Sequence, residues 1–211
     1  MPPTTSKDRR YRGQTAAERR RQRRDQLLDA GLELFGTVGF GATTIEMLCR
    51  TAQLQPRYFY EQFESREALL RAVYDRHVEA LMNAVLNALE QASDDPRDRL
   101  EAGLRAFVGA ALEDERLARI NYFEMLGVNR ELESRRRAVL RSYADLITAQ
   151  LDALDPARRP KLTHPRLGAV AIVGAVDGLI VDSLAGDRRT AAADRERLIA
   201  TLLDLVVPIE T

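Results

Sequence analysis

The sequence has few of the features that would place it in an oxidising compartment or in a membrane. It contains one cysteine, Cys49, among 211 residues, so no disulfide can form within a single chain. The longest apolar stretch covers only residues 167–176 and ends at Asp177, which is too short to cross a bilayer. The N-terminal residues are polar and Arg-rich, unlike a secretory signal. We therefore expect a cytoplasmic protein with no membrane partner.

The residues and motifs that enzymes use are also scarce. The chain has two histidines, His77 and His164, and they do not form a pair with metal-ligand spacing. It has no glycine-rich phosphate loop, no G-x-S-x-G motif and no evident catalytic triad. His77 lies on an apolar helical stripe, so we expect a core residue whose ring has hydrogen-bond partners. These absences predict a protein that is not an enzyme and that holds no metal or cofactor.

The formal net charge of zero conceals an uneven distribution. The chain has 32 basic and 32 acidic residues. Residues 1–24, however, contain nine basic and two acidic residues, which gives them a charge of +7 and leaves −7 for residues 25–211. Such a split favours an anionic partner for the N-terminal end of the chain. A solvated basic tail without a partner is the alternative.

The spacing of apolar residues is helical along nearly the whole chain, and no segment alternates as a strand does. Ser65 is expected to cap the fourth helix, which ends before the run Ser93-Asp94-Asp95-Pro96. The predicted fold class is all-α, with about nine helices in all. The expected helices cover residues 15–36, 44–52, 56–63, 65–92, 97–112, 116–126, 132–154, 164–184 and 191–206.

Two of these helices are short and lie only three residues apart. We expect helix 44–52 to begin with a capping box, in which the Thr43 hydroxyl accepts from an amide of the first turn and Glu46 reaches back to Thr43. Pro56 suits the first position of the next helix, where no N–H is needed. Two short helices behind a longer first helix form a helix-turn-helix, whose second helix enters the major groove of DNA.

The residues of this segment carry a family resemblance. The run Thr43-Thr44-Ile45-x-x-Leu48-x-x-x-Ala52-x-Leu54-x-x-x-x-Phe59-Tyr60-x-x-Phe63-x-x-Arg66-x-x-Leu69 resembles the TetR family of transcriptional regulators. The resemblance covers about residues 24–72. It implies a DNA-binding domain at residues 15–74, a flexible basic arm before it at 1–14, and an effector-binding and dimerisation domain after it at 75–211.

The resemblance also implies which residues contact DNA. It assigns phosphate contacts to Tyr60 and Arg66, and the helix N-terminus at Thr43 and Thr44 can hold a phosphate through free N–H groups and hydroxyls. Exposed residues of helix 56–63 are expected to read bases, with Arg57 able to bind guanine in a bidentate way. The predicted DNA-binding residues are Thr43, Thr44, Gln55, Pro56, Arg57, Tyr58, Tyr60, Gln62 and Arg66, with Arg20, Arg23 and Arg24 from the basic N-terminal segment.

Three residues depart from the family pattern. Gln53 stands at the usual glycine position of the turn, and a positive φ there would strain a glutamine by about 1 kcal/mol. Gln55 replaces the usual serine, and glutamine is a poor N-cap. Glu61 adds a negative charge near the surface expected to meet DNA. We expect these departures to affect the turn geometry and the base contacts.

The resemblance implies that the C-terminal part binds an effector and dimerises. Helix 164–184 is apolar on nearly all sides and rich in small residues, which favours burial against a second copy; a central core helix is the alternative. The predicted interface is the last two helices. Polar or aromatic residues on apolar helix faces are the candidates for binding a small apolar or amphipathic effector. They are Phe107, Asn121, Tyr122, Met125, Tyr143 and Asp177.

These expectations combine into one functional prediction. The chain is expected to be a homodimeric repressor that binds a palindromic double-stranded DNA operator and is released from it by a small-molecule effector. A constitutive DNA-binding protein without an effector is the alternative, and an enzyme is disfavoured. The operator, the regulated genes and the effector do not follow from the sequence.

Overall fold

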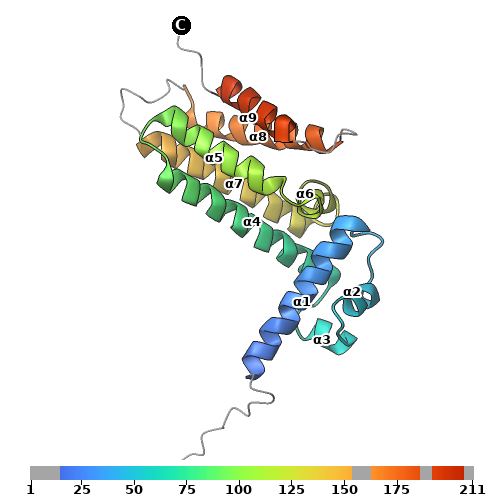
Figure 1. Cartoon of the computed structure of the whole chain (residues 1–211). Coiled ribbons are helices and arrows are strands. Elements are labelled where there is room, and N and C mark those ends of the chain that lie inside the picture. Colours follow the sequence, from blue (N-terminus) through green and yellow to red (C-terminus); the bar gives the residue numbers. More distant parts are fainter. Residues whose placement is uncertain (1–14, 154–162, 186–191, 207–211) are drawn as a thin grey trace, which may run out of the picture. The chain divides into compact units, whose positions relative to one another are not determined.

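The computed structural model describes residues 15–153, 163–185 and 192–206, and within them every regular element is helical. The prediction of an all-α fold is therefore confirmed. The elements, labelled in Figure 1, are α1 (Ala16–Thr37), α2 (Ile45–Thr51), α3 (Pro56–Tyr60), α4 (Arg66–Gln91), α5 (Pro96–Ala111), α6 (Glu115–Arg119), the π-helix η1 (Ile120–Glu124), α7 (Arg130–Ala153), α8 (Pro165–Ala185) and α9 (Ala192–Val206).

The chain divides into two units, Met1–Val73 and Tyr74–Thr211, with the division inside α4. In the first unit α1, α2, α3 and the start of α4 surround a small apolar core, in which Leu27, Leu48 and Phe59 are fully buried. Complete burial of each such side chain contributes about 1.5–3 kcal/mol. Gly31 allows α1 to approach α4 closely, because a Cβ at this position would lie 3.0 Å from Val73.

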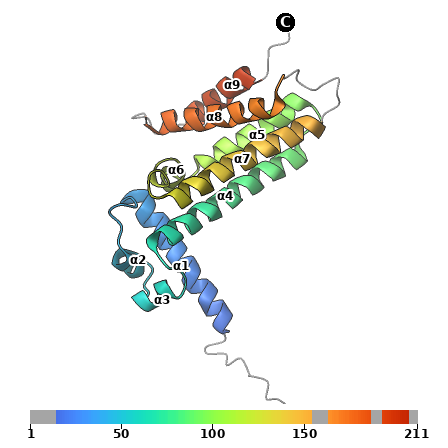
Figure 2. The ribbon, with the colours of Figure 1, turned by 180° about the vertical axis from the view of Figure 1, so that it is seen from behind.

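The second unit is a bundle of longer helices. Figure 1 and Figure 2 show α8 lying along α7 and α9 lying along α5, and both pairs are in contact. Ion pairs join the helices across these contacts: Arg136 of α7 binds Asp177 of α8 at 2.5 Å, and Arg105 of α5 binds Glu196 of α9 at 2.6 Å. The apolar core includes Val108, Tyr122, Ile180 and Leu202.

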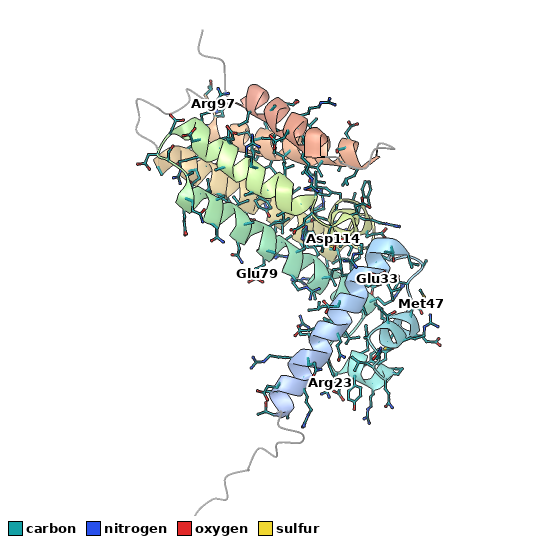
Figure 3. The ribbon with its side chains drawn as sticks, viewed as in Figure 1. Arg23, Glu33, Met47, Glu79, Arg97 and Asp114 are labelled. Atoms are coloured by element: carbon teal, nitrogen blue, oxygen red, sulfur yellow. The ribbon has the colours of Figure 1, made fainter. Side chains whose placement is uncertain are left out.

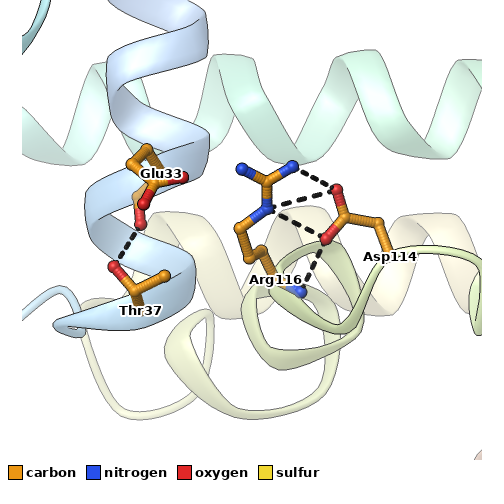
Figure 4. Close-up of polar contacts among 4 residues, drawn as sticks. All are labelled: Glu33, Thr37, Asp114 and Arg116. Atoms are coloured by element: carbon orange, nitrogen blue, oxygen red, sulfur yellow. Dashed lines mark hydrogen bonds and ion pairs between the residues drawn. The ribbon is translucent and has the colours of Figure 1, made fainter.

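The segment predicted as one helix at 116–126 is instead a short α-helix followed by a π-helix. Asp114 caps α6 by accepting from the Arg116 amide at 2.9 Å, and the Arg116 guanidinium binds the same carboxylate at 2.7 Å (Figure 4). In α1 the Thr37 hydroxyl donates to the Glu33 carbonyl, also drawn in Figure 4. The wider turn of η1 is closed by the Met125 amide, which donates to Ile120. Such π-turns are frequent at functional sites.

His77 and α8 each differ in one respect from what the sequence predicted. The His77 ring is buried as predicted, but its Nε2 atom has no hydrogen-bond partner in the structure. In α8, the segment Pro165–Leu184 is long and apolar enough to cross a membrane, by length and composition only. The prediction from the uninterrupted run missed this because it stopped at Asp177, whose charge is paired with Arg136.

Candidate nucleic-acid interface and ligand site

The turn between α2 and α3 has a positive φ at Gln53, the condition under which its sequence predicted strain. Gln53 adopts φ 55°, the conformation in which glycine carries no steric cost. The turn closes the end of α2, because the Leu54 amide donates to the Cys49 carbonyl at 2.9 Å. α3 then begins with Pro56 at its first position, and Gln55 precedes it without any side-chain capping bond. The turn is therefore strained at Gln53 and uncapped at Gln55.

The start of α2 differs from the prediction. Thr44, not Thr43, is the N-cap, and its hydroxyl accepts from the Met47 amide at 3.2 Å, so the expected capping box with Glu46 is absent. Thr43 is fully buried, and its hydroxyl donates to the Gly39 carbonyl at 2.7 Å. A buried hydroxyl with a backbone partner is not available to a phosphate. The prediction that Thr43 contacts DNA through its hydroxyl is therefore wrong, whereas Thr44 is exposed.

Arg66 secures the loop before α2. Its Nη1 donates to the Phe40 carbonyl at 3.2 Å and also to the Thr43 carbonyl. The guanidinium stacks over the Phe40 ring, with the carbon 4.8 Å from the ring centroid. Arg66 thus binds two carbonyl groups and one aromatic ring within its own unit, and these contacts stabilise the loop. Only the remaining N–H groups of its guanidinium are left to bind a phosphate.

α3 is anchored by one side chain and exposes others. Phe59 is fully buried and packs against Phe63, with ring centroids 6.0 Å apart. Tyr60 is 61% exposed, and Arg57 is also exposed. Because burial of Phe59 fixes the rotation of α3, the helix presents Arg57 and Tyr60 to solvent. The predicted base contacts Gln55 and Pro56 are exposed as well, and Tyr58 is half-buried.

Gln62 departs from this pattern. It lies beyond the end of α3, is half-buried, and its Nε2 atom is buried without a hydrogen-bond partner. A base-reading role was predicted for it as an exposed residue of the helix. The expected place of Gln62 within the helix is wrong, because α3 ends at Tyr60 and the chain turns inward toward the buried Phe63. Its contact with DNA stays a prediction.

The arginines at positions 20, 23 and 24 belong to α1 and not to an extended arm. Thr15 and Glu18 form a capping box that begins α1 at Ala16, and Figure 3 shows Arg23 on this helix. Arg20 donates to the Glu61 carbonyl at 3.5 Å, Arg23 pairs with the Glu61 carboxylate at 3.6 Å, and Arg24 stacks over Phe63 at 4.6 Å. The negative charge of Glu61 therefore has a cationic partner. The arm predicted at 1–14 lies outside the described residues.

The second unit brings several predicted ligand residues together. Phe107 and Tyr143 form an edge-to-face ring pair at 5.1 Å. Tyr122 is electrostatically coupled to Tyr143 and Asp177. The Tyr143 hydroxyl is buried without a hydrogen-bond partner in the structure, and the buried Tyr122 hydroxyl has only the Asn121 side chain, at poor hydrogen-bond geometry. Burial raises the pKa of each tyrosine well above its usual range. Met125 is fully buried and Asn121 is half-buried.

Sequence reasoning missed Arg136 and Tyr74 in this region. Arg136 is the partner of Asp177, and it couples electrostatically to Tyr74, whose pKa is also raised by burial. The signal for Arg136 was available: it lies four residues after the buried Leu132 and seven before the buried Tyr143, on the same face of α7. A charge on an apolar face predicts a partner on the facing helix.

Comparisons with known proteins agree with this architecture. A family model described as "Bacterial regulatory proteins, tetR family" matches residues 27–73. The transcriptional regulator TcmR of Streptomyces glaucescens is 32% identical over 97 residues, which are 45% of this chain and 41% of TcmR. The chain thus aligns with less than half of that relative's length.

Solved structures extend the fold likeness to most of the chain. The regulator FadR of Bacillus subtilis, in complex with stearoyl-CoA, has a TM-score of 0.78 at 17% identity, covering 87% of this chain and 97% of FadR. AibR, in complex with isovaleryl coenzyme A and operator DNA, has a TM-score of 0.68 at 16% identity, covering 88% and 98%. Residues 27–73 of the N-terminal unit are therefore similar to the DNA-binding segment of tetR-family regulators, and most of the chain shares the fold of FadR and AibR.

Proposed function

We propose that this chain is a homodimeric repressor that binds a palindromic operator and leaves it when an acyl-CoA-like effector binds its second unit. The observation that carries the proposal is the fixed presentation of α3, whose buried Phe59 holds Arg57 and Tyr60 toward solvent. Two copies related by a two-fold axis would place two such helices in successive major grooves, about 34 Å or a multiple of it apart.

The DNA contacts divide into two kinds. Tyr60 and the exposed N-terminus of α2 at Thr44 are suited to phosphates, which set the register of the domain on the duplex. Arg57, at the second position of α3, is suited to a guanine edge through two of its five N–H donors. Arg66 supports this surface indirectly, because it holds the loop from which α2 begins.

The dimer is proposed to form through α8 and α9. Leu167 and Val170 of α8 are 64% and 47% exposed, although the helix is apolar. A Cβ added at Gly174 or Gly178 would meet nothing within 4 Å, so one face of α8 is open to the close approach of another helix. A second copy covering this face would remove the exposed apolar surface from water, at about 25 cal/mol for each Å².

The effector site is proposed around Tyr122 and Tyr143. A buried hydroxyl without a partner, as at Tyr143, or with one poorly aligned partner, as at Tyr122, is costly unless a ligand or water satisfies it. Both hydroxyls can donate to a carbonyl oxygen, while the ring of Phe107 can pack against an apolar chain. FadR and AibR, which share the fold, bind stearoyl-CoA and isovaleryl coenzyme A. An acyl thioester therefore fits both the donor set and the likeness in fold.

Release of DNA requires that the effector bind two states of the dimer unequally. In one state the two copies of α3 are spaced to fit the operator, and in the other they are not. An effector that binds the second state more tightly lowers the affinity for the operator, by at most the ratio of its affinities for the two states. If the second unit binds no effector, the alternative function holds, that of a constitutive DNA-binding protein.

The test is operator release. The purified full-length chain is first used to select duplexes from genomic DNA fragments, and isovaleryl-CoA and stearoyl-CoA are then titrated into the complex with free coenzyme A as the control. We expect an acyl-CoA to raise the melting temperature of the protein and to weaken DNA binding, with free coenzyme A inactive. DNA binding that no acyl-CoA alters, without any thermal shift, would contradict the effector proposal.

A further inference from the structure

The ring of Tyr58, in α3, is in contact with two arginines. The guanidinium carbon of Arg57, the neighbouring residue, lies 4.6 Å from the ring centroid, and Arg57 Nη2 donates to the Tyr58 hydroxyl at 2.6 Å. The guanidinium carbon of Arg23, from α1, lies 4.5 Å from the same centroid. Each distance is within the range of a cation–π contact. The ring therefore joins a residue of α1 to the residue of α3 best suited to read a base.

Arg23 is itself held by its surroundings. Its Nη2 pairs with the Glu61 carboxylate at 3.6 Å, and its side chain is only 24% exposed. Its Nε atom is buried and has no hydrogen-bond partner in the structure. Glu61 also offsets the repulsion between two cations that share one ring. A guanidinium confined in this way is poorly placed to swing out to a DNA phosphate.

We infer that Arg23 is a positioning residue for base recognition, which acts through Tyr58 on Arg57, and is not a phosphate contact. The Tyr58 ring, held by Arg23 from α1, gives Arg57 a fixed aromatic surface and a fixed oxygen acceptor. One N–H of Arg57 is used for that oxygen, which leaves four of its five donors for a base edge. Preorganisation of a long side chain reduces the entropy lost on binding. The inference rests on DNA recognition by α3 and adds to it a determinant of specificity outside the recognition helix.

The two roles for Arg23 predict different binding data. A phosphate contact adds to affinity for every sequence, and its removal lowers the slope of log K against log salt by about 0.9. A positioning residue alters discrimination between sequences and leaves that slope unchanged. Removal of one exposed cation–π interaction corresponds to about a two- to five-fold change. The slope and the discrimination ratio therefore separate the roles.

The experiment uses the full-length chain and two duplexes. The first duplex is the one that the wild-type chain selects from a random-sequence pool. The second differs from it at one base pair, the position where Arg57→Gln no longer prefers one base over the others. Dissociation constants are measured by fluorescence anisotropy at several KCl concentrations for Arg23→Gln, Arg57→Gln and the double variant. Arg21→Gln, at an exposed position of α1, is the control with the same loss of charge. Arg23→Lys tests whether a cation alone is sufficient.

We expect Arg23→Gln to lower the discrimination ratio about three-fold with an unchanged salt slope, and to have no further effect on the ratio in the Arg57→Gln background. Arg21→Gln should leave the ratio unchanged. The inference would be overturned if Arg23→Gln weakened binding to both duplexes equally and lowered the salt slope. It would also be overturned if Arg23→Gln lowered the discrimination ratio by the same factor in the wild-type and Arg57→Gln backgrounds. Should the wild-type chain enrich no duplex, DNA recognition by α3 fails, and the inference fails with it.

A measurement without DNA keeps the outcome independent of selection. In the free protein, NMR resonances of the Arg57 guanidinium should carry a ring-current shift from Tyr58, and Arg23→Gln should reduce that shift while Arg21→Gln does not. An Arg57 signal that is insensitive to Arg23 in a folded variant would show that Arg23 does not act through the ring, even where DNA binding itself is intact.

Discussion

The Asp177 carboxylate of α8 lies 2.5 Å from the Arg136 guanidinium of α7, and both side chains are mostly buried, at 25% and 17% exposure. The same two helices are joined by a second ion pair, Arg166–Asp145 at 3.0 Å, whose side chains are 43% and 67% exposed. α8 also carries the surface proposed for dimerisation. The inner pair therefore fixes the helix on which both the proposed effector site and the proposed interface depend.

The two pairs should differ in their contribution to stability. Asp177→Asn leaves the Arg136 charge half-buried without its carboxylate, so we expect the free energy of unfolding to fall by about 1–3 kcal/mol. The matched control Asp145→Asn breaks an exposed pair and should cost less than about 1 kcal/mol. Urea denaturation followed by circular dichroism measures both. Equal losses would contradict the assignment of Asp177–Arg136 as the structural pair.

Removal of a buried tyrosine hydroxyl should affect stability and ligand binding in opposite directions. Tyr122→Phe deletes a buried hydroxyl whose one neighbour, Asn121, is poorly aligned for a hydrogen bond, so we expect the ligand-free chain to gain up to about 1 kcal/mol of stability. The same change removes a proposed donor to the acyl carbonyl, so the acyl-CoA should bind about ten-fold more weakly. Calorimetry with and without ligand measures both effects, with Tyr60→Phe, in the other unit, as the control. An unchanged affinity for acyl-CoA in Tyr122→Phe would show that the Tyr122 hydroxyl does not bind the effector.

Gln53 is expected to be a position where glycine is better than the residue present. Gln53→Gly relieves the cost of φ 55° and should stabilise the chain by up to about 1 kcal/mol, less the entropy that glycine adds to the unfolded state. Gln53→Ala, which keeps a Cβ at the same φ, is the control and should bring no gain. Thermal unfolding of the three proteins tests the prediction, and a gain from alanine equal to that from glycine would exclude backbone strain as the cause.

His77 should make stability depend on pH. Burial lowers the pKa of its imidazole to about 4, although Asp114 acts in the opposite direction, while the unfolded value is about 6.5. Because the unfolded state binds the proton more readily, the stabilising contribution is full above pH ~6.5 and is lost as pH falls toward ~4. Between pH 7 and pH 5 the loss is about 2 kcal/mol.

The control for this prediction is His77→Leu, which cannot titrate. Its free energy of unfolding should fall less over the same pH interval, and the difference between the two proteins isolates the histidine from all other titrating groups. Parallel pH profiles for the wild-type chain and the leucine variant would show that His77 is not the group responsible.

The basic residues ahead of α1 should contribute to DNA affinity without sequence preference. Residues 1–14 contain four basic residues and one acidic residue. Their removal, with the Thr15 cap and the whole of α1 retained, should weaken binding to all duplexes alike. The salt slope should fall by about 0.9 for each DNA phosphate that these residues neutralise in the full-length chain. An unchanged slope after truncation would mean that these charges do not meet DNA.

The sequence predicted the helical elements well because their boundaries depend on local chemistry. Pro56 begins α3 and Ser65 caps α4, with the Ala68 amide donating to its hydroxyl. For Gln53 the sequence predicted strain only on the condition that the turn has a positive φ there, and the structure meets that condition with φ 55°. Predictions of this kind need only neighbouring residues.

Features that depend on distant partners could not be predicted in the same way. The spacing of Thr43 predicted a cap, but its hydroxyl is bound to Gly39 and its carbonyl to Arg66, a residue 23 positions away. Arg23 was expected to meet DNA, yet it is held by Tyr58 and Glu61. The Arg23 side chain is thus held by long-range contacts inside the protein. The Thr43 hydroxyl is used by a carbonyl four residues away, and only the Thr43 carbonyl has a long-range partner.

The central claim is that α3 reads DNA through Arg57 in a two-fold symmetric complex. The most direct measurement is selection of duplexes from a random-sequence pool by the full-length chain and by Arg57→Gln. We expect the wild-type chain to enrich a palindrome, bound with a Kd of about 10⁻⁸ M or lower, and the variant to retain the half-site spacing but lose preference at one base pair in each half-site. Enrichment of no palindrome, or of the same sequence by both proteins, would contradict the account.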